Sequence, residues 1–147
     1  MRIIDQSAHA RGIFTLNVFH RGELIDQFSD DNLIVNQGRA NVARLLGGAS
    51  YDHRITKIGF GTNGSAAAPE NTALQGAHIK TVDAVSYPDA YSVLFGFSLG
   101  ASEANGLQIQ EFGLITQSGL LHARKVRGGI LVKDSDLTLS GTWKLMY

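Results

Sequence analysis

The first candidate for chemistry in this sequence is a glycine pattern within ITKIGFGTNG, residues 55–64. The pattern is Gly-x-Gly-x-x-Gly and consists of Gly59, Gly61 and Gly64. It is typical of a loop that holds dinucleotide phosphates at the start of a helix, and Asp83 follows at about the 20 residues where such sites place a ribose-binding acid. No helix is predicted here, because Pro69 lies in the following segment and removes a backbone donor. The pattern therefore indicates the end of a strand with a turn at residues 63–64, and no cofactor is expected.

The other side chains that could do chemistry form no catalytic or metal-binding pattern. The five histidines are His9, His20, His53, His78 and His122. They have neither HxxxH nor HxH spacing and no cysteine partners, so we interpret them as surface or turn residues. KDSD at residues 133–136 could begin a calcium loop, but the later ligands are missing, which favours a polar turn. Ser118 lies in TQSG without the frame of a nucleophile, so neither an enzyme nor a metal site is expected.

One dense basic cluster lies in LLHARKVRGG, and two interpretations of it stay open. Its members are His122, Arg124, Lys125 and Arg127. A charged, solvated strand edge would discourage aggregation between sheets. Alternatively, Arg124 or Arg127 pairs with a carboxylate of a neighbouring subunit, which makes these two arginines the candidate subunit interface. In that case, replacing both with alanine should lower assembly and leave the stability of the monomer unchanged.

Length and composition limit the classes of protein to which this chain can belong. At 147 residues it is expected to form a single domain, residues 1–147, whose core needs neither metal nor disulfide. Thirteen basic and thirteen acidic residues give a formal net charge of +0, so no overall field attracts nucleic acid or anionic lipid. No apolar run approaches the roughly 18 residues that indicate a membrane span. The expected partners therefore include neither nucleic acid nor membrane.

Apolar residues recur mostly with period two, which predicts short strands joined by glycine turns. In AYSVLFGFSLG and LTLSGTWKLMY, the alternation places large side chains on one face of each strand. The predicted core residues are Tyr91, Val93, Phe95, Phe97, Leu99, Leu137, Leu139, Trp143 and Leu145. In LQIQEFGLI the apolar phase shifts, so we expect a β-bulge near Glu111.

A hairpin and one helix complete the expected elements. The strands that flank HRG, residues 20–22, are connected as in a β-hairpin. In NQGRANVARLLGG, helical spacing of apolar residues, a cap at Asn36 and a glycine stop predict a short α-helix near residues 37–46. The fold class is therefore mainly β, namely an antiparallel β-sandwich with one short α-helix, and a jelly-roll-like strand order is one option.

The order of five segments resembles a known family. They are NQGRANVARLLGG, ITKIGFGTNG, PENTAL, YSVLFGFSL and NGLQIQEFGLITQSGLLHARKV. In order, these are a glycine-capped helix, a strand ending in a G-x-G turn, a loop with proline and Thr-Ala-Leu, a long strand, and an E-x-G-L strand followed by a second strand. Over about residues 32–127, the chain resembles the N-terminal region of bacteriophage tail-collar fibre proteins and related small virion proteins.

The resemblance implies a bacteriophage structural protein that is made in the host bacterial cytoplasm and located in the virion. Its expected role is non-catalytic docking in the tail, collar or baseplate, as a homo-oligomeric ring or trimer that contacts other virion proteins. A long fibre protein would continue beyond Tyr147 into a shaft and a receptor-binding tip. Attachment is therefore the expected role, rather than binding of a host receptor.

Two other functions stay open. A capsid decoration protein would share the fold class and the absence of catalysis but would lie on the head lattice. A carbohydrate-binding or hydrolytic β-sandwich would present exposed aromatic residues with paired carboxylates. Trp143 and most of Tyr91, Phe95 and Phe97 fall on the predicted inward faces, which favours a role in the core over stacking on a sugar.

Overall fold

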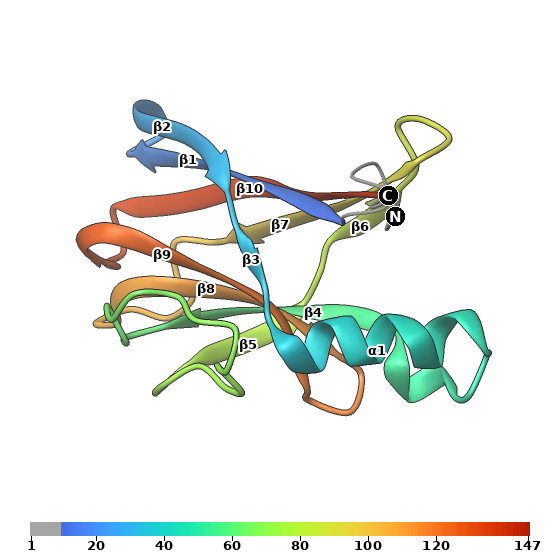
Figure 1. The fold of residues 1–147 in the computed structure, drawn as a ribbon. Coiled ribbons are helices and arrows are strands. Elements are labelled where there is room, and N and C mark those ends of the chain that lie inside the picture. The colour runs from blue at the N-terminus through green and yellow to red at the C-terminus, as the bar shows by residue number, and fades with distance from the viewer. Residues whose placement is uncertain (1–9) are drawn as a thin grey trace, which may run out of the picture.

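The computed structural model describes residues 10–147 as two five-stranded antiparallel sheets packed face to face (Figure 1). The first sheet has the order β2 (Glu23–Asp31), β1 (Arg11–His20), β10 (Leu137–Met146), β7 (Ser92–Leu99) and β6 (Ala84–Ser86). The second has the order β3 (Leu33–Ile34), β9 (Leu121–Val132), β8 (Gln108–Thr116), β4 (Ile55–Gly61) and β5 (His78–Thr81). The predicted mainly β sandwich with one α-helix is confirmed.

The chain reaches this arrangement by combining local hairpins with crossings between the sheets. β1 and β2 are joined by Arg21 and Gly22, whose φ angles of 49° and 82° give the two-residue turn that suits a hairpin. The chain crosses to the other sheet after β2, after β5, after β7 and after β9. Residues from distant parts of the sequence therefore line one core.

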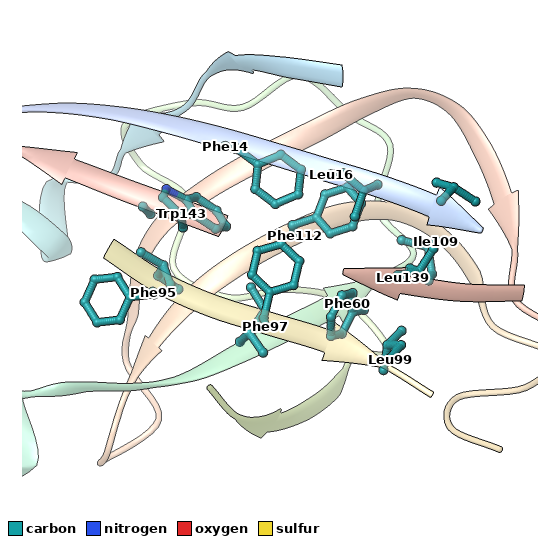
Figure 2. Close-up of a cluster of buried hydrophobic side chains, with 14 of the residues drawn as sticks. Phe14, Leu16, Phe60, Phe95, Phe97, Leu99, Ile109, Phe112, Leu139 and Trp143 are labelled. Atoms are coloured by element: carbon teal, nitrogen blue, oxygen red, sulfur yellow. The ribbon is translucent and has the colours of Figure 1, made fainter. Parts of the chain in front are cut away.

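The core between the sheets is centred on aromatic rings (Figure 2). The ring centroid of Phe14 lies 5.0 Å from that of Trp143, 4.6 Å from that of Phe112 and 5.6 Å from that of Phe97. These four residues come from β1, β10, β8 and β7, so both sheets contribute to the cluster. Burial of rings of this size is a large stabilising contribution, and their tilted and edge contacts add to it.

Seven of the nine predicted core residues are buried: Phe95, Phe97, Leu99, Leu137, Leu139, Trp143 and Leu145. Val93 is partly buried and packs against the same cluster. The prediction for Tyr91 is wrong, because its side chain is 74% exposed. β7 begins only at Ser92, and Tyr91 lies in the preceding turn, where its carbonyl oxygen accepts a hydrogen bond from the N–H of Tyr147 at 2.8 Å.

The pairing of β8 with β9 shifts its register at Glu111, the position predicted for a bulge, but the single extra residue expected in β8 is not what causes the shift. Ile109 lies opposite Leu131, but Glu111 lies opposite Val126, so residues 127–130 of β9 face the single residue 110 of β8. The extra residues therefore belong to β9. Ile109, Phe112 and Leu114 of β8 all lie in the core between the sheets, while Glu111 is buried against Arg124.

The helix α1 (Asn36–Leu46) lies beside the second sheet, and the 3-10 helix η2 (Tyr51–His53) follows it (Figure 1). The cap prediction is wrong: the N-cap residue is Val35, and no side chain caps the helix. The N–H of Asn36 instead donates to the carbonyl oxygen of Pro69 at 2.8 Å. The glycine stop is present, since Gly48 has a φ of 66°. No helix in residues 10–147 is long and apolar enough to cross a membrane.

Candidate functional site

Gly59 and Gly61 lie at the end of β4, and Gly64 lies in the loop that follows, residues 62–77. This loop contains no helix. A Cβ atom at Gly61 would lie 2.5 Å from Oε2 of Glu111, and one at Gly64 would lie 2.3 Å from Oε1 of Gln110. These glycines therefore make room for polar side chains of β8. Asp83 directly precedes β6 and accepts a hydrogen bond from Ser98 of β7 at 2.7 Å. It therefore belongs to the other sheet and lies away from the glycines. The interpretation as a strand end holds.

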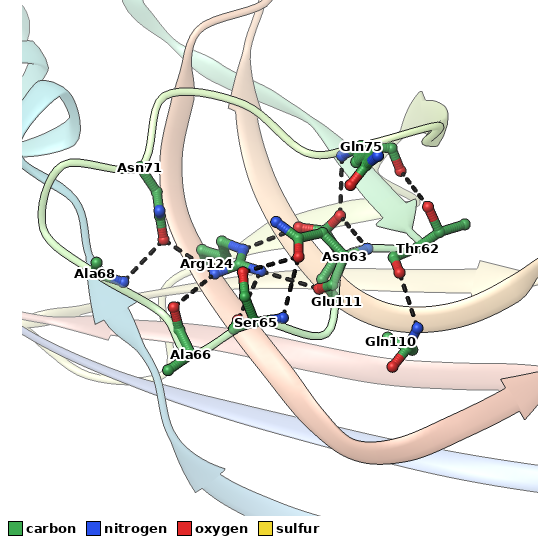
Figure 3. A network of polar contacts seen from close by, with 10 residues as sticks. All are labelled: Thr62, Asn63, Ser65, Ala66, Ala68, Asn71, Gln75, Gln110, Glu111 and Arg124. Atoms are coloured by element: carbon green, nitrogen blue, oxygen red, sulfur yellow. Dashed lines mark hydrogen bonds and ion pairs between the residues drawn. The ribbon is translucent and has the colours of Figure 1, made fainter.

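A buried ion pair between Arg124 of β9 and Glu111 of β8 lies beneath this loop (Figure 3). Both side chains are fully buried, and Nε of Arg124 donates to Oε1 of Glu111 at 2.9 Å. The terminal nitrogens of Arg124 donate to the side chain of Asn71 and to the carbonyl oxygens of Asn63, Ser65 and Ala66. All five N–H groups of the guanidinium are thereby hydrogen-bonded.

Glu111 completes the network from the other side of the ion pair. Its Oε2 accepts hydrogen bonds from the backbone N–H groups of Asn63 and Gln75, each at 2.9 Å. The two ends of loop 62–77 are therefore held by one carboxylate, and the segment between them is held by one guanidinium. A loop without regular structure gains a fixed position on the sheet in this way.

The structure corrects the prediction that Arg124 pairs with a neighbouring subunit, because its side chain is enclosed and its carboxylate partner belongs to the same chain. Arg127 also finds an internal partner, since its NH2 lies 3.5 Å from Oδ2 of Asp26. Lys125 pairs with Asp30 at 2.6 Å. Arg124, Lys125 and Arg127 of the basic cluster thus all pair within the chain. Replacement of Arg124 should therefore lower the stability of the monomer, whereas the sequence led us to expect no change.

The other polar motifs have structural roles. Oδ1 of Asp134 accepts hydrogen bonds from the N–H groups of Asp136 and Leu137 at 2.9 and 3.1 Å, which makes KDSD the turn between β9 and β10. Among residues 10–147, no group of three or more histidine, cysteine, aspartate or glutamate side chains is placed to hold a metal ion. His122 is fully buried, which corrects its interpretation as a surface or turn residue. His9 lies outside the described residues.

An apolar cavity of about 560 Å³ lies between α1 and the end of β10. Figure 1 shows α1 and the C-terminus at the same end of the sandwich. Its walls come from α1, η2 and the start of β4 on one side, and from β6, β7 and the end of β10 on the other. Six of the lining residues are exposed, namely Arg54 and five apolar or tyrosine residues. We call these five the rim: Leu46, Tyr51, Val85, Tyr87 and Tyr147. Exposed apolar groups gathered in this way indicate a binding surface.

His122 is a fully buried polar residue next to this cavity. Nδ2 of Asn41 donates to the carbonyl oxygen of His53 at 2.8 Å, which fixes the orientation of the amide. The same nitrogen lies 3.5 Å from Nδ1 of His122, so Nδ1 must be the acceptor. In the neutral ring the proton is then on Nε2, which has no hydrogen-bond partner among residues 10–147.

This arrangement depends on a close approach of α1 to β9. A Cβ atom at Gly38 would lie 2.0 Å from the carbonyl oxygen of His122, so only glycine allows the helix to lie this near the strand. Asn41, one turn later and buried, is thereby brought to the His122 ring. Sequence reasoning missed this site. The signal in the sequence was Gly38 followed three residues later by Asn41, which places a glycine and a polar residue on one face of the predicted helix.

Burial of His122 predicts a pH-dependent stability. It lowers the pKa of the imidazole to about 4, from 6.5. Between these two values the unfolded chain binds a proton that the folded chain does not, so the free energy of unfolding should fall as the pH falls from about 6.5 to about 4. The expected loss from this residue is about 3 kcal/mol. Urea unfolding at pH 7, 5.5 and 4 measures it.

The pH dependence that comes from His122 can be separated from that of the carboxylates by replacing this residue. His122→Gln keeps a polar side chain of similar length and removes the titrating group, so its unfolding free energy should decline less over the same pH range. Equal declines in the wild type and the variant would contradict the assignment to His122.

Comparison with protein-family models, with curated proteins and with solved structures finds no match to this chain.

Proposed function

We propose that this protein is a non-catalytic docking component of a bacteriophage tail, collar or baseplate. The observation that carries the proposal is the rim, where Leu46 is 85% exposed and Tyr87 is 77% exposed beside other apolar residues. Contiguous apolar and tyrosine-rich surface is typical of protein interfaces. The segment order that resembles tail-collar fibre proteins supplies the setting.

The rigidity of the sandwich supports a docking role. Two sheets share one aromatic core, and loop 62–77 is held by the Arg124–Glu111 pair instead of moving freely. A surface that is fixed in advance loses little conformational entropy when it binds. Because the ion pair is enclosed by its own loop, its charges are occupied in holding the fold and are closed to a substrate.

A second candidate function, carbohydrate binding, is favoured by one specific observation. Four tyrosines are exposed: Tyr51, Tyr87, Tyr91 and Tyr147. Tyrosine rings can stack on sugars, and the exposure of Tyr91 removes part of the argument against such a function. Trp143 is buried, however, and offers no stacking surface. A capsid decoration protein remains a third candidate, and only the location in the particle separates it from a tail component.

The proposal predicts where the protein lies in particles of the phage or prophage that encodes it. Gold-labelled antibody against the chain should decorate the tail, collar or baseplate of purified virions. When a deletion phage is complemented with Tyr87→Ser/Tyr147→Ser, incorporation should fall about tenfold, because interface tyrosines often contribute more than 1 kcal/mol each.

Ile25→Ser is the matched control for the double variant. Ile25 is 58% exposed on β2 and does not line the cavity, so its replacement should leave incorporation at the wild-type level. Label over the head would instead favour the decoration protein. Intact virions without label would contradict a structural role.

A further inference from the structure

The apolar cavity between α1 and the end of β10 has the volume of a small-molecule site. Its volume of about 560 Å³ lies within the range of about 300–1,000 Å³ that is usual for ligand pockets. Val42 and Leu45 of α1 are half-buried and line it on one side. Phe95 of β7 and Leu145 of β10 are buried and line it on the other. Most of the wall is therefore apolar, and a ligand is oriented by the few polar groups beside it.

Arg54 supplies a positive charge at this cavity. Among the lining residues, all within residues 10–147, it alone carries a side chain that is charged at neutral pH, and none of the lining side chains is acidic. No carboxylate of residues 10–147 forms an ion pair with its guanidinium, not even that of Asp52, two residues earlier. The charge of Arg54 is therefore available to an anion that enters the cavity.

The backbone and a neighbouring ring hold Arg54 in place. Its N–H donates to the carbonyl oxygen of Tyr51, and its own carbonyl oxygen accepts from the N–H of Gln117, each at 2.9 Å. The guanidinium lies over the ring of Tyr51, 4.6 Å from the centroid. A guanidinium stacks on a ring with its flat face, so the N–H groups along its edge can still bind a carboxylate.

We propose that this cavity binds a small carboxylic acid, whose apolar body lies against the walls and whose carboxylate pairs with the guanidinium of Arg54. The proposal does not rest on the virion role, because it concerns the interior of the cavity and not protein contacts of the rim.

The charge of the lining selects this class of ligand. Arg54 would repel an organic cation, and no acidic side chain of the lining offsets that repulsion. A phosphate monoester carries between one and two negative charges at neutral pH, whereas the lining supplies one cation. A carboxylate carries a single charge and can accept two parallel hydrogen bonds from a guanidinium. His122 is fully buried and is not needed for this contact.

Two probes of nearly equal shape test the proposal, namely 2-naphthoate, which is an anion, and 2-naphthamide, which is neutral. Equilibrium dialysis with the wild-type chain at neutral pH should show saturable binding of naphthoate. Arg54→Gln should weaken naphthoate about two- to fivefold, as the loss of one partly solvated ion pair allows, and should leave naphthamide unchanged. Added sodium chloride should weaken naphthoate more than naphthamide in the wild type, because salt screens the pair.

Arg44→Gln is the matched control for the charge. Arg44 is exposed in the last turn of α1 and does not line the cavity, so its replacement removes the same charge nearby and should change neither affinity.

A second pair of variants tests the location of the probes. Val85 is 46% exposed on the edge strand β6 and lines the cavity, so Val85→Trp should narrow the mouth and weaken both probes. Ile25→Trp on β2 is the control and should bind both as the wild type does, because Ile25 lies away from the lining.

The proposal is overturned if Arg54→Gln binds naphthoate as tightly as the wild type, or if it weakens both probes equally, since neither result fits a carboxylate paired with Arg54. Failure of naphthoate to saturate the wild-type chain would overturn it as well. None of these results bears on the docking role, which the location of the protein in virions tests separately.

Discussion

Replacing Arg124 with methionine is expected to lower the free energy of unfolding by about 3–5 kcal/mol, because the carboxylate of Glu111 would remain buried without its cation. Four further hydrogen bonds from Arg124 to loop 62–77 are lost at the same time. Urea unfolding at pH 7 measures the loss. Amide exchange should also speed up within the loop, starting with Gln75, whose N–H is bound to Glu111.

The matched control is Arg127→Met, which removes the same charge from the same strand. Arg127 is partly exposed and its ion pair with Asp26 is 3.5 Å long, so a loss of no more than about 1 kcal/mol is expected. The double variant Arg124→Met/Glu111→Leu should lose less than the sum of the two single changes, because neither charge is then left unpaired. A loss in Arg124→Met no larger than that of the control would show that the pair does not hold the loop.

Trp143→Ala is expected to lower the free energy of unfolding by about 3–5 kcal/mol. The side chain is fully buried, and its ring packs edge-on against Phe14 at a centroid distance of 5.0 Å, so its removal leaves a large cavity between the sheets. Chemical denaturation in urea or guanidinium gives the value directly. A near-neutral result would mean that the ring does not belong to the core and would return Trp143 to the candidates for sugar stacking.

Trp143→Phe separates the loss of packing from the loss of the indole N–H. Nε1 of Trp143 is buried without a hydrogen-bond partner, so phenylalanine removes an unsatisfied donor while keeping an aromatic ring. The expected loss is clearly smaller than for alanine, because both variants remove the unsatisfied donor but only phenylalanine keeps an aromatic ring in the core. Equal losses for the two variants would contradict the packing of the ring between the sheets.

His122 lies next to the cavity and is also buried against Asn41. Its variants should therefore be compared at a pH where each is folded.

The sequence by itself determined the long strands β7 and β10, the hairpin of β1 and β2, and the position of the irregularity near Glu111. Each of these depends on residues close together in the chain: alternation in β7 and β10 places one face inward, and the turn at residues 21–22 fits only a tight connection. The same local rule misplaced Tyr91, because alternation does not mark the residue at which a strand begins.

Only the tertiary structure decided what the charged and polar residues do. Arg124 looked like a surface charge, because its partners Glu111 and Asn71 lie 13 and 53 residues away in the sequence and are brought to it by pairing of β8 with β9 and by loop 62–77. The His122 site likewise needs α1, η2 and strands of both sheets. Local pattern sets which side of a strand is apolar, but the partner of a buried charge or donor depends on which distant segments pack against it.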